Sequence, residues 1–331
     1  MRAVNSWSRP RLGVIGDTIL LPLRCQACAL IFLEGPMIHK SIFYGTLAAL
    51  TCAIAGGVLI GMANDFLLGY TMFLVLPGVT GFVTAMTSRF WSSVGISLLI
   101  TLAVCLGGLL FSGLEGLVCV LMAFPILVIT AMLGAGIGLA IRDHVTNDSK
   151  FSLGIMPLLA GISIFGAGKV ENELTTGVRT ETVVSSITID ATPEDVWDAL
   201  LEFDRVEGPK PLLMRCGLPI PESCTTEGTG VGSQRTCHFN SGFVRERVTR
   251  WEPGQCLEFD VVDVQLPGRH WLGFQGAKYT LETTDTGQTL VKRTTIVTST
   301  LRPAIYWQFF ERLGTETEHE YILKSLRAEL E

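Results

Sequence analysis

The first half of the chain consists of long apolar runs. Four stretches contain no Asp, Glu, Lys or Arg, namely 41–64, 66–88, 90–114 and 116–141, and a shorter fifth covers 151–168. A helix needs about 20 apolar residues to cross a hydrocarbon core of about 30 Å. The pattern therefore predicts an α-helical membrane region of about five transmembrane helices.

After residue 181 the pattern becomes that of a water-soluble domain. Val183, Ile187 and Ile189 alternate with polar residues, which predicts a strand. Thr192 then has the side chain of a helix N-cap, and Pro193 follows in the first turn, where its missing N–H is tolerated. We expect a strand that leads into a short amphipathic helix.

Five further strand-like runs follow: 234–240, 243–251, 256–265, 276–282 and 289–298. The sequences "EPGQ" and "TDTGQ" between them supply turn residues. The last stretch, 303–331, has the apolar spacing of one long helix. This order predicts an α+β domain, in which a long C-terminal helix lies across a curved antiparallel sheet.

Charge divides the chain at the same place. Residues 1–169 carry a net charge of +3, whereas residues 170–331 carry −9. We divide the chain into an N-terminal extension (1–40, with Met37 as an alternative start), a membrane region (41–168), a polar linker (169–181) and a soluble domain (182–331). The acidic domain excludes nucleic acid as a partner, because phosphate contacts need a basic face.

Basic residues predict the orientation in the membrane. Lys40, Arg89, Arg142 and Lys150 all lie in short segments on one side of the expected spans. Such residues mark the cytoplasmic side. Five crossings then place the C-terminal domain on the non-cytoplasmic side of a bacterial inner membrane. If the fifth run does not cross, the domain lies in the cytoplasm instead.

Three pieces of the soluble half resemble the START-like (SRPBCC) helix-grip superfamily of polyketide cyclases/dehydrases and lipid-transfer domains. They are "SITIDATPEDVWDALLEFDRV", "EGTGVGSQRTCHFNSGFVRERVTRWEPGQCLEFDV" and "RPAIYWQFFERLGTETEHEYILKSL". The resemblance covers roughly residues 182–330 and implies an apolar cavity between the sheet and the long helix. Such cavities hold a lipid or another hydrophobic molecule, for which we expect several hundred cubic ångströms.

Alternation along the strands nominates the residues that face the cavity. The ligand-binding candidates are Phe239, Glu246, Leu257, Phe259, Val261, Tyr279, Leu281, Trp307 and Phe310. Glu246 faces inward only if Val244 and Val248 share the inner face. The alternative inner face is Phe243, Arg245, Arg247 and Trp251.

Glu246, His238 and His319 are the candidates for acid–base catalysis, and His319 also matches a histidine associated with the resembling subgroup. A buried carboxylate has a raised pKa and suits proton transfer. No pairing of nucleophile and base is evident, so the sequence favours binding over catalysis.

Two further motifs carry little chemistry. The loop "GTGVGS" leads into a strand rather than a helix N-terminus, so it does not predict a phosphate site. Cys224 and Cys237 are the most plausible disulfide among four cysteines of the soluble half, although the spacing leaves the other pairings and free thiols open. That half has no C-x-x-C pair, and we expect neither a metal nor a cofactor.

The leading hypothesis is therefore a membrane-anchored protein that binds or transfers a hydrophobic, lipid-like molecule. A cyclase/dehydrase-type enzyme that acts on an apolar substrate is the first alternative. A membrane-anchored interaction protein with a filled core is the second.

Overall fold

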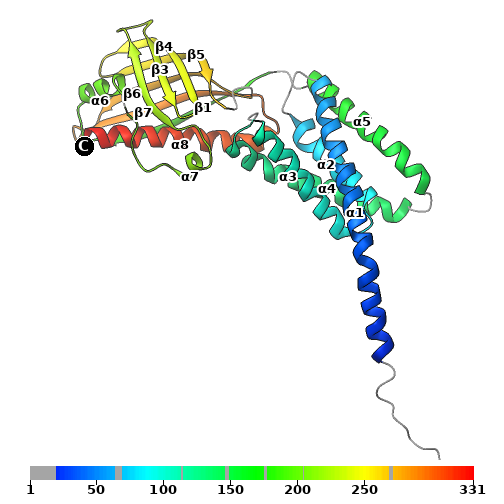
Figure 1. Cartoon of the computed structure of the whole chain (residues 1–331). Coiled ribbons are helices and arrows are strands. Elements are labelled where there is room, and N and C mark those ends of the chain that lie inside the picture. Colours follow the sequence, from blue (N-terminus) through cyan, green and yellow to red (C-terminus); the bar gives the residue numbers. More distant parts are fainter. Residues whose placement is uncertain are drawn as a thin grey trace, which may run out of the picture.

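The computed structural model describes residues 20–63, 69–112, 115–145, 149–174, 177–203, 205–267 and 271–331. The predicted extension 1–40 thus lies partly outside the described residues. His270, a further titratable residue of the soluble half, lies wholly outside them. The N-terminal half is helical (Figure 1). Its elements are α1 (Leu20–Ala63), the π-helical turn η1 (Thr71–Val75), α2 (Leu76–Thr87), α3 (Trp91–Phe111), α4 (Leu117–Val145) and α5 (Ser149–Leu174).

Three helices of the described chain are long and apolar enough to cross a membrane: Met37–Met62, Trp91–Phe111 and Leu117–Arg142. The prediction of about five spans is not confirmed. In place of the second span, an apolar helix of 17 residues runs from Thr71 to Thr87, a length of about 26 Å. The fifth span coincides with α5, whose first turns lie among residues whose side chains are not described.

Glycines bring α2 and α4 into close contact. A Cβ added to Gly81 would lie 1.9 Å from the carbonyl oxygen of Ala131, and one added to Gly134 would lie 1.9 Å from that of Gly78. Only glycine permits such an approach between two backbones, and apolar helices in membranes commonly pack in this way. The glycine-rich sequence therefore reflects tight helix packing.

The predicted linker 169–181 is shorter in the structure, because α5 continues to Leu174 and the first strand begins at Arg179. Glu171 gives a physical reason for the longer helix. Its carboxylate accepts hydrogen bonds from the backbone N–H groups of Tyr70 (2.5 Å) and Thr71 (2.8 Å) at the start of η1. A carboxylate at a helix N-terminus satisfies otherwise unpaired N–H groups.

The C-terminal half is the predicted α+β domain. Its elements are β1 (Arg179–Ile189), α6 (Pro193–Leu201), α7 (Leu212–Arg215), β2 (Pro221–Glu227), β3 (Gln234–Phe239), β4 (Gly242–Glu252), β5 (Cys256–Gln265), β6 (Leu272–Thr283), β7 (Thr289–Ser299) and α8 (Ala304–Leu330). The strands form one antiparallel sheet in the order β1-β7-β6-β5-β4-β3-β2. The sequence pattern had missed β2, because its strand lies in a proline-rich passage.

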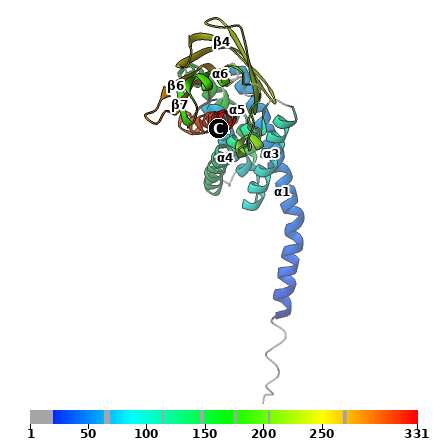
Figure 2. The same cartoon turned by 90° about the vertical axis from the view of Figure 1, so that its left-hand side faces the viewer.

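The long helix α8 lies across the concave side of the sheet (Figures 1 and 2). The core between them contains Trp197, Leu257, Phe259, Tyr321 and Leu326, all buried. Thr192 caps α6 as predicted, since its side chain accepts a hydrogen bond from the N–H of Asp195. Burial of the apolar faces of α8 and the sheet against each other stabilises the domain.

The domain also packs against the apolar helices, near the first turns of α4. The hydroxyl of Tyr306 donates a 2.5 Å hydrogen bond to the carbonyl of Met122. The rings of Phe73 and Trp307 lie 4.7 Å apart, in a buried cluster that includes Leu301 and Ile126. The N-terminal end of α8 is thus anchored to the helical region, and its remainder extends along the sheet (Figure 1).

Candidate ligand-binding cavity

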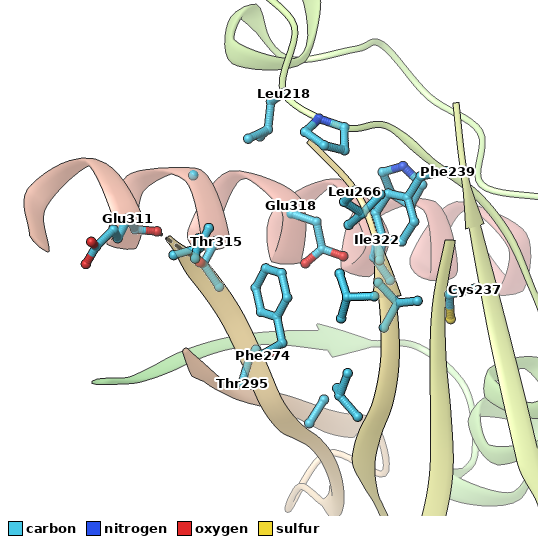
Figure 3. A pocket seen from close by; sticks show the side chains of 18 of the residues that line it. Leu218, Cys237, Phe239, Leu266, Phe274, Thr295, Glu311, Thr315, Glu318 and Ile322 are labelled. Atoms are coloured by element: carbon cyan, nitrogen blue, oxygen red, sulfur yellow. Dashed lines mark hydrogen bonds between the residues drawn. The ribbon is translucent and has the colours of Figure 1, made fainter. Parts of the chain in front are cut away.

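A cavity of about 170 Å³ lies between the sheet and α8, and its lining is mostly apolar. Figure 3 shows Thr315, Glu318 and Ile322 projecting from α8 toward Phe274 and Thr295 on the strands. The volume is smaller than the several hundred cubic ångströms that we expected. It resembles that of an engineered cavity of about 150 Å³ that holds benzene, so it accommodates one ring or part of one chain.

One end of the cavity is closed by the helical region. Gly116, just before α4, and Cys119 and Met122 in its first turns line it together with Trp271 and Trp307 of the domain. The indole N–H of Trp271 lies 3.4 Å from a carboxylate oxygen of Glu115, just before α4. The wall of the cavity is therefore shared between the domain and a helix that is long enough to span a membrane.

The lining also includes two ion pairs, one buried and one half-buried. Nη1 of Arg235 lies 3.5 Å from a carboxylate oxygen of Glu246, and Nη2 of Arg293 lies 2.9 Å from one of Glu318. Both guanidinium groups lie within 6 Å of the Tyr279 ring centroid, at 5.9 and 5.5 Å. The pairs thus form one polar cluster, named here the polar floor: Arg235, Glu246, Arg293 and Glu318.

The polar floor is incompletely hydrogen-bonded. Nε of Arg235, Nε and Nη1 of Arg293 and Oε2 of Glu246 are buried and have no hydrogen-bond partner. Buried polar groups are normally paired, because an unpaired one loses about 1–3 kcal/mol of desolvation free energy. Such a cluster in a cavity is a candidate for contact with a ligand.

Burial shifts the proton affinities of two groups here. It raises the pKa of the Glu246 carboxyl, and the positive charges of Arg235 and Arg293 oppose this only in part. Burial likewise raises the pKa of the Tyr279 hydroxyl. Both groups therefore favour their neutral forms more than they would in water.

Six of the nine candidates from the sequence line the cavity: Phe239, Glu246, Val261, Tyr279, Trp307 and Phe310. The other three, Leu257, Phe259 and Leu281, are buried in the hydrophobic core. Glu246 lies on the inner face of β4 with Val244 and Val248, which are both buried. Of the alternative face, Arg247 is exposed and Arg245 half-buried, whereas Trp251, beyond a register shift in β4, packs on the core with its ring 5.3 Å from that of Trp197.

Neither candidate histidine is placed for catalysis. His238 is exposed on β3. His319 is fully buried between α8 and the sheet, with Nε2 2.7 Å from the Thr295 hydroxyl and Nδ1 3.1 Å from the Ser185 hydroxyl. Burial, and then the charge of Arg293, lower the pKa of His319 to about 2. This imidazole is a neutral contact between the helix and the sheet.

A disulfide joins Cys224 and Cys237, which face each other on β2 and β3. Both cysteines also line the cavity. The glycines of "GTGVGS" adopt positive φ values in the turn before β3, at 228, 230 and 232, rather than preceding a helix. Within the described residues, no group of three or more His, Cys, Asp or Glu is arranged to hold a metal ion.

Sequence reasoning missed Arg235, Arg293, Glu318 and the residues of α4. A signal existed for the arginines. Arg235 is in phase with the inward-facing Cys237 and Phe239, and Arg293 is in phase with the buried Val291. A charged residue at an inward position of a strand departs from the usual alternation and suggests function.

The family comparison bears on the same part of the chain. Residues 180–331 match the family described as polyketide cyclase / dehydrase and lipid transport. This part of the chain is therefore similar to START-like (SRPBCC) domains. The predicted resemblance is confirmed for the soluble half, and the apolar helices precede it. No curated protein matches the chain.

Solved structures of low sequence identity are similar to the domain. They include the Aha1 dimer from Colwellia psychrerythraea (22% identity, 46% of this chain and 96% of that chain, TM-score 0.31). The Zhui aromatase/cyclase from Streptomyces sp. R1128 is 15% identical over 46% of this chain and 94% of that chain, with a TM-score of 0.33. A norcoclaurine synthase from Thalictrum flavum is 12% identical over 47% of this chain and 97% of that chain, with a TM-score of 0.33.

Proposed function

We propose that the protein is a membrane-anchored receptor or carrier for a hydrophobic, lipid-like molecule. The observation that carries this proposal is the shared wall of the cavity. An apolar cavity in a START-like domain is bounded by Cys119 and Met122 of a helix that is apolar enough to lie in a bilayer. A molecule that leaves the membrane beside α4 would reach the cavity without crossing water.

The tether increases the local supply of ligand. A domain held at a fixed distance from the membrane meets membrane-derived molecules at a high effective concentration. The volume of 170 Å³ favours a single-chain or small cyclic molecule over a two-chain lipid. Dispersion and desolvation of the chain would provide most of the affinity, at roughly 25 cal/mol per Å² of apolar surface.

The domain is proposed to lie on the non-cytoplasmic side of a bacterial inner membrane. The disulfide between Cys224 and Cys237 supports this location, because such bonds persist in oxidising compartments. The basic residues in the short connections between the apolar runs support the same orientation.

Glu246 favours a second candidate, an enzyme of the cyclase/dehydrase type. It is a titratable group inside the cavity, and burial raises its pKa toward the range of a general acid. Tyr279, on β6, lines the same cavity. Turnover of an apolar substrate that is lost in Glu246→Gln, with retained binding, would favour this candidate over a carrier.

The first test is native mass spectrometry of the full chain, released from lipid nanodiscs together with any bound molecule. We expect a co-purifying apolar molecule at near one per protein. Cys119→Trp would fill the α4 end of the cavity and should reduce occupancy at least about fivefold, because the indole would occupy the space that the ligand needs.

Leu121→Trp is the matched control, since Leu121 is two residues away on α4 and is exposed. Its occupancy should equal that of the wild type. An empty wild-type protein that remains empty after incubation with bilayer lipids would contradict the proposal. Equal occupancy in Cys119→Trp and Leu121→Trp would contradict the shared-wall argument.

A further inference from the structure

We propose that the polar floor binds the head group of a single-chain carboxylic acid, whose chain runs along the cavity toward α4. This inference rests on the proposed function and specifies its ligand class. It assigns a head-group site to Arg235, Arg293, Glu246 and Glu318, all of which line the cavity.

The balance of donors and acceptors favours an anionic head group. Three guanidinium nitrogens, Nε of Arg235 and Nε and Nη1 of Arg293, are buried without an acceptor. The one carboxylate oxygen here without a hydrogen bond, Oε2 of Glu246, still lies 3.5 Å from Nη1 of Arg235. A carboxylate offers only acceptors and matches the planar fork of a guanidinium group in bidentate fashion. An alcohol or amine head would leave most of these donors unpaired.

The charges favour a monoanion. Two guanidinium groups face two carboxyl groups, but burial favours the neutral form of Glu246. If Glu246 takes up a proton when the ligand binds, the polar floor carries one surplus positive charge. One carboxylate balances it, whereas a doubly charged phosphate would leave an excess negative charge in a buried site.

The position of the polar floor orients the molecule. Glu318 lies eight residues beyond Phe310 on α8, a rise of about 12 Å along the helix. Phe310 and Trp307 line the cavity near α4, and the lining between the two ends includes Phe274 and Gly314. The acid would therefore enter head first, and its chain would occupy the apolar end beside α4.

The test compares ligands that share a chain but differ in the head group. Decanoate, decanol and decyl phosphate would be titrated into the full-length protein in nanodiscs, with native mass spectrometry as the readout and protein-free nanodiscs as the blank. Decanoate should bind at least about tenfold more tightly than decanol, given the strength of hydrogen bonds to charged groups. It should also bind more tightly than decyl phosphate.

Two variants test the residues. Glu318→Gln retains an acceptor for Arg293 and removes one negative charge, so decanoate affinity should rise by about tenfold while decanol affinity stays unchanged. Glu320→Gln is the matched control, because Glu320 is exposed on the same helix and pairs with Lys324. The double variant Arg293→Leu/Glu318→Leu replaces a half-buried ion pair by apolar side chains, a change that is often tolerated even for fully buried pairs. It should bind decanol normally and lose the preference for decanoate.

The outcomes separate the two proposals. If decanol binds as tightly as decanoate, the inference of a carboxylate site is wrong, whereas the proposed binding of a lipid-like molecule is retained. Tighter binding of decyl phosphate would overturn the carboxylate assignment. If none of the three ligands binds, the inference of a single-chain acid fails, and the proposed function then depends on whether an apolar molecule co-purifies with the wild-type protein. An unchanged decanoate affinity in Glu318→Gln would show that the polar floor does not recognise the head group.

Discussion

His319 shows how burial determines the role of a single residue. In the sequence it was a candidate for acid–base chemistry, but the structure buries it completely between Thr295 and Ser185. With its pKa lowered to about 2, the imidazole cannot act as a proton donor near neutral pH. Glu246, in contrast, is buried but lines the cavity, near polar atoms that have no hydrogen-bond partner. It is therefore the titratable residue that a ligand could contact.

The pKa of His319 predicts a pH dependence of stability. The unfolded chain binds this proton with a pKa of 6.5 and the folded chain with one of about 2, so protonation favours unfolding. Stability should fall as the pH drops below 6.5, by about 1 kcal/mol per pH unit. The melting temperature of the full-length protein in detergent, measured from pH 8 to pH 5, would show this loss.

His319→Asn is the control for that slope, because it keeps a polar side chain but does not titrate. The raised pKa of Glu246 acts in the opposite direction in both proteins, since stability falls as the pH rises above 4.5. The difference between the two pH profiles therefore isolates His319. Identical profiles would contradict the assignment of a neutral buried imidazole.

At the scale of elements, α8 has two different tasks. Its C-terminal part packs on the sheet through Tyr321 and Leu326. Its first turns pack on the helical region through Tyr306 and Trp307. The same helix therefore lines the cavity and connects the domain to α4. A movement of α4 relative to the domain would therefore alter the shape of the cavity.

Trp307→Ala tests this connection. Trp307 is 4% exposed, and the loss of a buried aromatic ring should destabilise the protein by roughly 3 kcal/mol. Phe309→Ala, at a position 63% exposed, should change stability by no more than about 0.5 kcal/mol. Thermal unfolding of both full-length variants in detergent gives the comparison. Equal shifts would show that the contact with Phe73 contributes little.

At the scale of the whole molecule, the cavity belongs to neither half alone. The domain contributes most of its wall, and α4 closes the end that faces the helical region. Gly217 of the domain also lies against Leu117 and Val118, where an added Cβ would be 3.6 Å from either residue. A soluble version that lacked α4 would have a more open cavity.

The proposed orientation is testable with C-terminal fusions. In a bacterial host, alkaline phosphatase fused after Glu331 should be active, whereas green fluorescent protein at the same position should be dark. The physical reason is the bias of basic residues to the cytoplasmic side and the presence of the Cys224–Cys237 disulfide. The reverse result would place the domain in the cytoplasm and change the number of crossings.

The sequence by itself determined the class of each half. Charge-free runs predicted apolar helices, because only burial in lipid or protein stabilises so many apolar residues. The period of two in 183–189 and the cap at Thr192 predicted a strand followed by a helix, because these signals are local. The family resemblance was also carried by local motifs, and the match to residues 180–331 confirmed it.

Only the tertiary structure decided the site. Arg235 and Glu246 belong to different strands, and Arg293 meets Glu318 of α8 only because the helix crosses the sheet. The wall from α4 depends on packing between residues more than 100 positions apart, such as Tyr306 and Met122. Local patterns report which face of an element is buried, but long-range contacts decide which buried faces meet and whether a cavity remains between them.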